Sequence, residues 1–283
     1  MNGSSSLLSV ENLTMQFGGL HAIEDLSMTA RAGEVTAVIG PNGAGKTTFF
    51  NCLTGFYKPT KGSVKLRHPQ RGELRLDAMR NVDVARVGQV VRTFQNIRLF
   101  PRMTVLENLM IAQHNVLQQA SRFSIAGALN SKSFRHANDK AIEQALTWLE
   151  RLSVRDIANK PAGDMPYGVQ RRVEIARAMC AEPILLCLDE PAAGLNPRES
   201  AELTALLTSL SREQGIGILL IEHDMSVVMK VSDHIVVLNH GKKIAEGLPA
   251  EIKANPEVIG AYLGEDDETS SHDDASQEKT AHA

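Results

Sequence analysis

The sequence predicts an α/β fold with a mainly parallel sheet, an antiparallel β portion near the N-terminus and an inserted helical subdomain. Two short, wholly apolar runs, residues 184–188 and 216–221, are typical of buried strands in a parallel sheet. Segments with helical periodicity alternate with these runs, at residues 169–181 and 199–214. Because strands that alternate with helices indicate a parallel α/β sheet, this pattern decides the fold class.

The N-terminal part begins with strands. Residues 8–15 alternate loosely between apolar and polar side chains and predict a strand, and residues 22–30 predict another. Residues 34–39 predict a third, more apolar strand. Residues 62–76 are β-like but polar, which favours a hairpin that turns at residues 67–72. We therefore expect an antiparallel β portion in addition to the parallel sheet.

The middle of the chain interrupts the alternation of strands and helices. Residues 105–119 and 139–152 carry helical periodicity, and residues 121–136 between them are irregular. We therefore expect a helical subdomain at about residues 95–165, followed by a further helix that runs to residue 181.

The C-terminal part closes the domain. Residues 234–238 and 243–246 flank an Asn-His-Gly-Lys segment, which is a hairpin turn signal. We therefore expect a single domain over residues 8–264. Residues 265–283 are acidic and nearly free of apolar side chains, which predicts a disordered tail, with an acidic docking tail as the alternative.

Composition limits the class of protein. The net charge of −3 argues against a dominant nucleic-acid partner. No apolar run approaches the roughly 20 residues of a membrane-spanning helix, and the first residues lack a signal-peptide pattern, so we expect a cytoplasmic protein. Cys52, Cys180 and Cys187 have no motif spacing and suit reduced, buried thiols, and the histidines show no metal-ligand spacing.

The most informative motif lies between the strand at residues 34–39 and a helix predicted at residues 47–53. It fits the phosphate-loop pattern G-x-x-x-x-G-K-[ST] at every fixed position. Glycines let backbone N–H groups point at phosphate oxygens, Lys46 supplies a charge for the β- and γ-phosphates, and the Thr47 hydroxyl can ligate Mg²⁺. The alternative is a glycine-rich turn without a ligand. The predicted nucleotide-binding residues are Gly40, Pro41, Asn42, Gly43, Ala44, Gly45, Lys46, Thr47 and Thr48.

Two carboxylates end the apolar strand at residues 184–188. Asp189, at the tip of this strand, is the predicted Mg²⁺ ligand. Glu190 follows it and is the candidate that polarises the attacking water. The alternative is an ordinary solvated acidic pair. Gln95, before the helical insert, could give another oxygen to Mg²⁺, although a lone Gln is more often a surface residue.

Two further parts of the sequence are expected to contact phosphate in a nucleotide site built on a parallel sheet. His223 follows a buried strand, and ligands of these sheets bind at the carboxyl ends of strands, although a lone histidine is more often structural. Tyr167 and Gly168 open a helix whose N-terminus can bind an anion. Since the chain has one phosphate loop, this second element is expected to read the nucleotide of another copy or a paralogue.

Over residues 8–264 the chain resembles the ATP-binding-cassette ATPase family. The resemblance lies in an ordered set of motifs: the phosphate loop, Gln95, Tyr167-Gly168, Asp189-Glu190, a Gly-Leu-Asn segment at residues 194–196, and His223. The resemblance implies a phosphate-loop ATPase core, two subunits that close head-to-tail over two ATP molecules, and Mg²⁺. It also implies that Phe17 stacks on adenine, although alone it is only a strand-end aromatic.

The segments at residues 92–108, 190–197 and 246–264 are similar to the larger ATPase of branched-chain amino acid importers. This resemblance implies two membrane-spanning permease subunits, a paralogous or identical ATPase partner, an indirectly coupled extracytoplasmic binding protein, and a place at the cytoplasmic face of the inner membrane. The alternatives are a transporter ATPase for urea, amides or lipid, a switch protein on ribosomes or DNA, and a phosphate-loop kinase.

The chain departs from the general family pattern in two places. Pro166 replaces the serine that normally meets the partner's γ-phosphate, and Asn196 replaces an aspartate. Both Asn196 and Tyr167 fit the importer subgroup. The hairpin at residues 62–91 carries extra arginines, which indicates a variable solvated face or, alternatively, a regulatory or lipid-facing contact.

Overall fold

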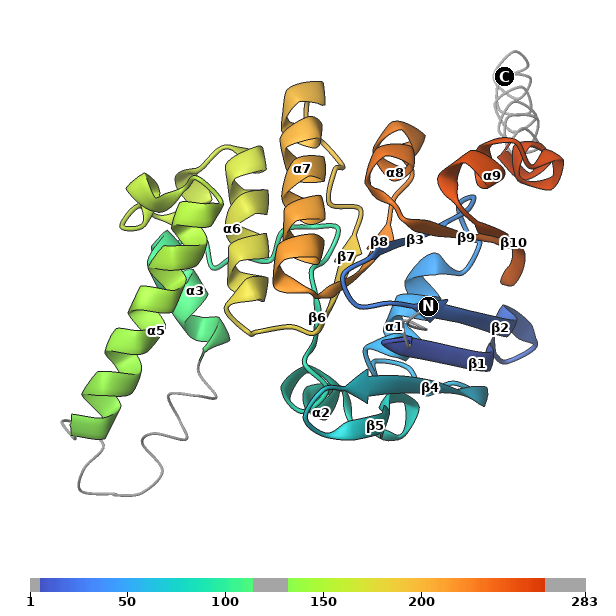
Figure 1. Cartoon of the computed structure of the whole chain (residues 1–283), viewed down its shortest axis with the longest axis horizontal. Coiled ribbons are helices and arrows are strands. Elements are labelled where there is room, and N and C mark those ends of the chain that lie inside the picture. The colour runs from blue at the N-terminus through green and yellow to red at the C-terminus, as the bar shows by residue number, and fades with distance from the viewer. Residues whose placement is uncertain (1–5, 114–131, 263–283) are drawn as a thin grey trace, which may run out of the picture.

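A four-stranded antiparallel sheet forms one side of the molecule (Figure 1). The structure, a computed structural model, describes residues 6–113 and 132–262. The sheet has the order β2-β1-β4-β5, and a tight turn at Gly18 joins its first two strands. Its strands are β1 (Leu8–Phe17), β2 (Leu20–Ala30), β4 (Lys61–His68) and β5 (Gly72–Arg75).

A second sheet of six strands has the order β10-β9-β3-β8-β7-β6. All neighbouring strands in it run parallel except β9 and β10, which form a hairpin. At the turn of this hairpin His240 and Gly241 both have positive φ, as a two-residue hairpin loop requires. The strands are β3 (Val35–Ile39), β6 (Val90–Arg92), β7 (Leu185–Asp189), β8 (Gly217–Ile221), β9 (His234–Asn239) and β10 (Lys242–Gly247).

Helices cover both faces of the parallel sheet. On one face α1 lies between the two sheets, where Phe49 and Phe50 pack against β-strand side chains. On the other face α6 and α7 cover β7 and β8, and α3 and α5 pack against α6. The helices are α1 (Lys46–Leu53), α2 (Asn81–Arg86), α3 (Val105–Ala112), α5 (Lys132–Arg151), α6 (Tyr167–Met179), α7 (Pro197–Gln214), α8 (Met225–Val231) and α9 (Pro249–Lys253).

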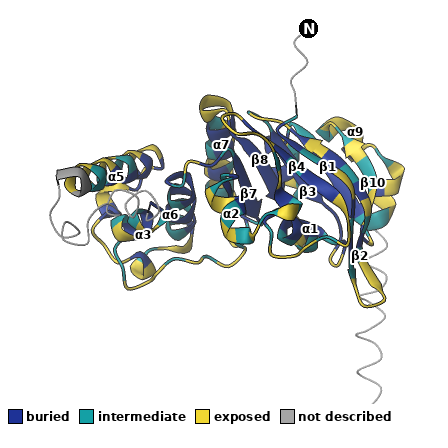
Figure 2. Cartoon of the chain, turned by 90° about the horizontal axis from the view of Figure 1, so that it is seen from below, coloured by how far each residue is buried: buried dark blue, intermediate teal, exposed yellow. Residues whose placement is uncertain are grey.

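The central strands are buried on both faces, as Figure 2 shows for β3, β7 and β8. Alternate residues of β7 serve two cores: Leu185 and Cys187 face α1, whereas Leu186 and Leu188 face α6 and α7. This two-sided burial explains why these strands are mostly apolar and show no alternation of apolar and polar residues. It also fixes the carboxyl ends of β3, β7 and β8 beside one another.

The predicted fold class is confirmed, and most predicted elements occur within a few residues of their expected ends. The expectation of an irregular segment at residues 121–136 is wrong from Lys132 onward, where α5 begins. The predicted helix from residue 105 ends at Ala112, and residues 114–119 lie outside the described part. Strand β6 and the short helices α2, α8 and α9 were not predicted.

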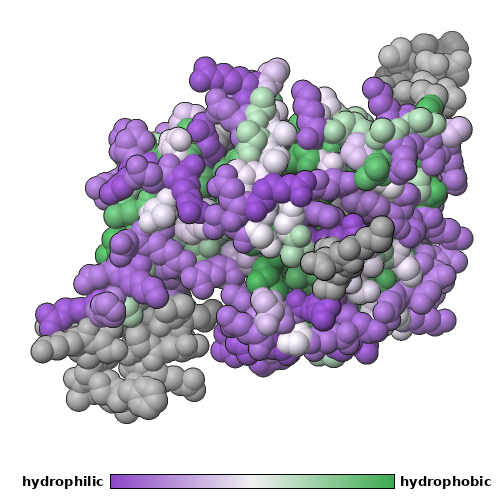
Figure 3. All heavy atoms as spheres, in the orientation of Figure 1, coloured by the Kyte–Doolittle hydropathy of each residue, from purple (hydrophilic) through white to green (hydrophobic). Residues whose placement is uncertain are grey.

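Hydrophilic residues cover most of the face shown in Figure 3. Within residues 6–113 and 132–262, no helix has both the length and the apolar composition needed to cross a membrane. The acidic tail predicted at residues 265–283 lies outside the described residues. The limits of the helical subdomain stay a prediction.

Candidate functional site

The phosphate loop connects β3 to α1 and has the backbone that its glycines allow. Gly40, Gly43 and Gly45 have φ of 149°, 79° and 99°. A side chain at Gly45 would place its Cβ 2.5 Å from the carbonyl oxygen of Ala22, and one at Gly40 would meet that of Leu238 at 2.0 Å. Two of the glycines are therefore required by close packing as well as by backbone conformation.

Lys46, the first residue of α1, is nearly buried in this loop. Its ammonium donates hydrogen bonds to the carbonyl oxygens of Gly40 and Pro41, at 2.6 and 2.8 Å. The loop thereby orients the ammonium. A cavity of about 530 Å³ adjoins it, and its lining includes most of the loop together with residues predicted for catalysis and metal binding. The lining residues are Leu20, His21, Ala22, Asn42, Gly43, Ala44, Gly45, Lys46, Thr47, Thr48, Gln95, Glu190 and His240.

Glu190 is the point at which three predicted site residues meet. The amide of Gln95 donates a 2.7 Å hydrogen bond to Oε2 of Glu190, and Nδ1 of His223 lies 3.5 Å from the same oxygen. Glu190 itself has φ of 46°, in the left-handed region that costs a non-glycine residue on the order of 1 kcal/mol. This turn at the end of β7 brings the carboxylate into the lining of the phosphate-loop cavity.

A buried carboxylate supports the backbone beside His223. Glu222 is fully buried, and its side chain accepts hydrogen bonds from the backbone N–H groups of Ala192 and His223, at 2.7 and 3.2 Å. Burial raises the pKa of Glu222, while these backbone donors oppose the rise. Glu222 thus ties the segment after Glu190 to the segment after β8.

Asp189, the predicted metal ligand, is buried and paired with an arginine. Nη2 of Arg92 lies 2.6 Å from Oδ2 of Asp189, and both side chains are less than a tenth exposed. Asp189 is absent from the lining of the cavity that contains Thr47 and Gln95. Sequence reasoning missed Arg92, because an arginine at the end of a three-residue strand gives no signal of a buried role.

The residues predicted to read a second nucleotide lie apart from this cavity. Tyr167 is 42% exposed at the start of α6, and Gly168 is buried beside the carboxylate of Glu199. Pro166 takes the N-cap position without a side-chain hydrogen bond, and Asn196 caps α7 instead. A single chain cannot bring Tyr167 and Gly168 to another copy's nucleotide, so that role stays a prediction.

Phe17 also lies outside the cavity lining. Its ring is 42% exposed and meets the ring of Tyr57 edge-to-face, with centroids 5.2 Å apart. Leu20 and His21, a few residues further along the same hairpin, do line the cavity. The stacking role of Phe17 stays a prediction, and neither His21 nor His240 belongs to a motif that would have identified it.

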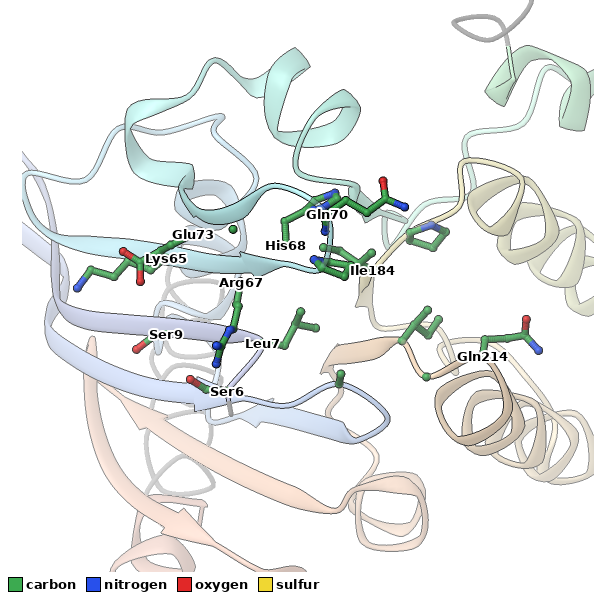
Figure 4. A pocket seen from close by; sticks show the side chains of 16 residues that line it. Ser6, Leu7, Ser9, Lys65, Arg67, His68, Gln70, Glu73, Ile184 and Gln214 are labelled. Atoms are coloured by element: carbon green, nitrogen blue, oxygen red, sulfur yellow. Dashed lines mark hydrogen bonds between the residues drawn. The ribbon is translucent and has the colours of Figure 1, made fainter. Parts of the chain in front are cut away.

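A larger cavity, of about 1030 Å³, lies elsewhere (Figure 4). It opens between β4 and the amino ends of β7 and β8, whereas the phosphate loop lies at the carboxyl ends of the strands. His68 in its wall is already used, because Nε2 lies 2.9 Å from Oε1 of Gln89 and Nδ1 accepts a hydrogen bond from the N–H of Gln70. This cavity contains no predicted site residue.

The oxygen donors near the phosphate loop fit a magnesium ion. Thr47 and Gln95 line the cavity, and the Asp189 carboxylate lies outside this lining at the end of β7, two strands from β3. Magnesium in nucleotide sites takes one or two carboxylates together with substrate phosphates and waters, so a rich cluster of ligands is not required. Accordingly, the described residues hold no group of three or more His, Cys, Asp or Glu side chains suited to a metal.

Comparison with known families gives two matches. Residues 23–193, more than half of the chain, match the model of the ABC transporter family. Residues 242–268 match a family described as the branched-chain amino acid ATP-binding cassette transporter.

Two curated relatives cover nearly the whole chain. The high-affinity branched-chain amino acid transport ATP-binding protein LivG of Salmonella typhimurium is 52% identical over 262 residues, which cover 93% of this chain and 99% of the relative. The high-affinity branched-chain amino acid transport ATP-binding protein BraF of Pseudomonas aeruginosa is 50% identical over 262 residues, which cover 93% of this chain and 99% of the relative.

A solved structure has the same fold. The ADP conformation of MJ1267, an ATP-binding cassette of an ABC transporter, superposes with a TM-score of 0.77 at 30% identity, covering 92% of this chain and 99% of that one. A nucleotide-free ATP-binding cassette from an ABC transporter superposes with a TM-score of 0.75 at 31% identity, covering 91% of this chain and 99% of that one. The chain therefore belongs to the ABC transporter family, as one of its nucleotide-binding ATPase subunits.

Proposed function

We propose that this chain is the ATP-hydrolysing subunit of an importer for branched-chain or other hydrophobic amino acids, held at the inner face of the cell membrane. The observation that carries the ATPase part is the meeting of Gln95 and His223 on Glu190, at the cavity of the phosphate loop. The cargo rests on similarity to LivG and BraF alone. An importer or exporter ATPase for another cargo is the alternative.

The proposed chemistry uses few groups of the chain. Lys46 and the loop N–H groups bind the phosphates of ATP, and Gln95 and His223 hold Glu190 in place. Glu190 accepts a proton from a water whose oxygen bonds to the γ-phosphorus. The bond between that phosphorus and the bridging oxygen breaks, and ADP and phosphate leave. Mg²⁺, when bound through Thr47 and Asp189, would neutralise charge on the phosphate oxygens.

The partners follow from the family. We propose that two such subunits, identical or paralogous, close over two ATP molecules, and that each offers its Tyr167-Gly168 helix start to the other. The N–H groups at this start suit phosphate oxygens, while Pro166 offers neither a hydroxyl nor an N–H. An extracytoplasmic binding protein would act through the membrane subunits without touching this chain.

A cavity of about 590 Å³ suits a segment of a membrane subunit. It lies between α2 and β6 on one side and the ends of α3 and α6 on the other. Phe56 and Val82 in its lining are 53% and 63% exposed, and Phe94, which precedes Gln95, lines it as well. We assign this cavity to a helical segment of the permease, because an apolar contact there would reach the backbone that carries Gln95.

Affinity purification of the full chain from mildly solubilised membranes, with mass spectrometry, tests the transporter assignment. We expect two multi-span membrane proteins and a second ATPase, and ligand titration of the accompanying binding protein would give the cargo. V82K should lose the membrane proteins, while L248K, a change of an exposed leucine outside this cavity, should keep them. Recovery of ribosomes or DNA without membrane proteins would contradict the transporter assignment.

A further inference from the structure

Arg92 binds the side chain that the metal would need. Its Nη2 atom lies 2.6 Å from Oδ2 of Asp189, and the two side chains are 6% and 9% exposed. Such a pair is shielded from solvent, so the attraction between its charges is much stronger than in an exposed ion pair. Among the described residues, Arg92 is the only one that donates a hydrogen bond to the side-chain oxygens of Asp189.

The guanidinium of Arg92 is held from three further sides. Nη1 donates a 2.6 Å hydrogen bond to Oδ1 of Asn51 in α1. The guanidinium also lies over the rings of Phe50 and Phe94, with 5.5 and 5.1 Å to their centroids. Nε is buried without a hydrogen-bond partner in the described part of the chain, so the position is set by the other contacts. Arg92 therefore joins α1, β6 and β7 at one point.

The pairing has a consequence for metal binding. A guanidinium at hydrogen-bond distance neutralises most of the charge that a carboxylate would offer to Mg²⁺. Consistent with this, Asp189 is absent from the lining of the phosphate-loop cavity, whereas Thr47 and Gln95 are part of it. Arg92 instead lines the cavity assigned above to the membrane subunit.

We propose that Arg92 is a positioning residue that competes with Mg²⁺ for Asp189 and so sets how strongly the metal reinforces ATP binding. The inference rests on the proposed function, since it concerns regulation of the same site. Because Arg92 also lines the cavity next to Phe94, an occupant of that cavity acts on the guanidinium that restrains the metal ligand. Membrane contact and metal binding are thereby linked through one side chain.

Calorimetric titration of the full chain with the non-hydrolysable ATP analogue AMP-PNP tests the proposal. Affinity is measured at pH 8 in saturating Mg²⁺ and in EDTA, and the ratio of the two reports the coupling between metal and nucleotide. R92M should raise this ratio about 10-fold. Changes of about this size in metal affinity are typical when a residue that hydrogen-bonds to a metal ligand is replaced. The affinity in EDTA should stay unchanged, because Arg92 does not line the phosphate-loop cavity.

Arg98 provides the matched control. Its guanidinium also stacks on Phe94, 3.9 Å from the ring centroid, but it makes no contact with Asp189. R98M should therefore keep the unmodified ratio. In the background of D189N, R92M should no longer change the ratio, because the competition needs the carboxylate.

R92K is the second variant, for the case that R92M does not fold. Because lysine keeps a positive charge beside Asp189, R92K leaves no buried carboxylate unpaired. Lysine keeps the charge but cannot bond Asn51 and Asp189 through two N–H groups in a fixed plane, so we expect a smaller rise of the ratio. A ratio that stays unchanged or falls in R92M and R92K would overturn the competition. Failure of the unmodified chain to bind AMP-PNP in either buffer would instead overturn the proposed function.

Discussion

The guanidinium of Arg171, inside α6, lies 2.7 Å from the carbonyl oxygen of Gln95 and 2.9 Å from that of Phe94. Arg171 also pairs with Glu174 at 2.7 Å, and both side chains are 1% exposed. Glu174 accepts a hydrogen bond from the N–H of Arg98. The helix that starts at Tyr167 thus holds the backbone of Gln95, which in turn holds Glu190.

R171M should destabilise the protein strongly, because it removes the nearest cation from the buried Glu174 carboxylate, which keeps only the N–H of Arg98 and Arg177 at 4.0 Å. We expect a loss of about 3–5 kcal/mol in the free energy of unfolding, measured by urea denaturation. R198M removes an exposed ion pair with Glu202 and should cost less than about 1 kcal/mol. Similar losses for the two variants would contradict a structural role for the buried pair.

The phosphate loop should tolerate a methyl group at one glycine and not at another. G45A would bring Cβ to 2.5 Å from a backbone oxygen, whereas nothing lies within 4 Å of a Cβ at Gly43. Both residues have positive φ, so the backbone strain is shared and the clash differs. G45A should abolish binding of a fluorescent ATP analogue, and G43A should weaken it far less. Equal losses of affinity in G45A and G43A would show that the contact of the Cβ added at Gly45 with the backbone oxygen is relieved without moving the loop.

The cysteines should be unreactive in the native protein. Cys52, Cys180 and Cys187 are buried free thiols, and burial raises the pKa of each to about 12. Protonated, inaccessible thiols react slowly, so Ellman's reagent at pH 8 should label none of them within minutes. Unfolding in guanidinium chloride should release all of them. Rapid labelling of the native chain would contradict the packing of α1, α6 and β7.

The burial of Glu222 should be visible in the pH dependence of stability. Its raised pKa means that the folded state favours the protonated form, so its contribution to stability is full below the unfolded pKa and is lost as pH rises through the folded value. E222Q removes this titration. The free energy of unfolding of E222Q relative to the unmodified protein should therefore increase as pH rises from about 4.5. A difference that is independent of pH would show that Glu222 keeps an ordinary pKa.

The parts of the fold that the sequence predicted are those with a strong local pattern. Residues 185–188 of β7 and all of β8 are apolar because both faces of these strands are covered, and α7 carries an apolar stripe. Strand β6 has only three residues, and α2 and α8 have six and seven, which is too short for periodicity to be recognised. The first turns of α5 are polar, so their helix leaves no hydrophobic pattern.

The residues of the candidate site also fall into those with a strong local pattern and those without one. The phosphate loop and the Asp189-Glu190 pair were predicted, because binding phosphate and metal requires those residue types in a fixed local order. Arg92 and Arg171 were missed as site residues, because their partners lie 97 and 76 residues away in the sequence. Only the fold brings such charges together, and no local pattern distinguishes a buried arginine from an exposed one.

E190Q tests whether Glu190 acts as the base of an ATPase. The measurement is phosphate release from ATP together with equilibrium binding of ATP to the same preparation. E190Q should lose turnover by at least about 100-fold, as expected when a general base is removed, and should keep the affinity of the unmodified chain for ATP. Equal loss of binding and turnover, or turnover that persists in E190Q, would contradict the role of Glu190 as the base.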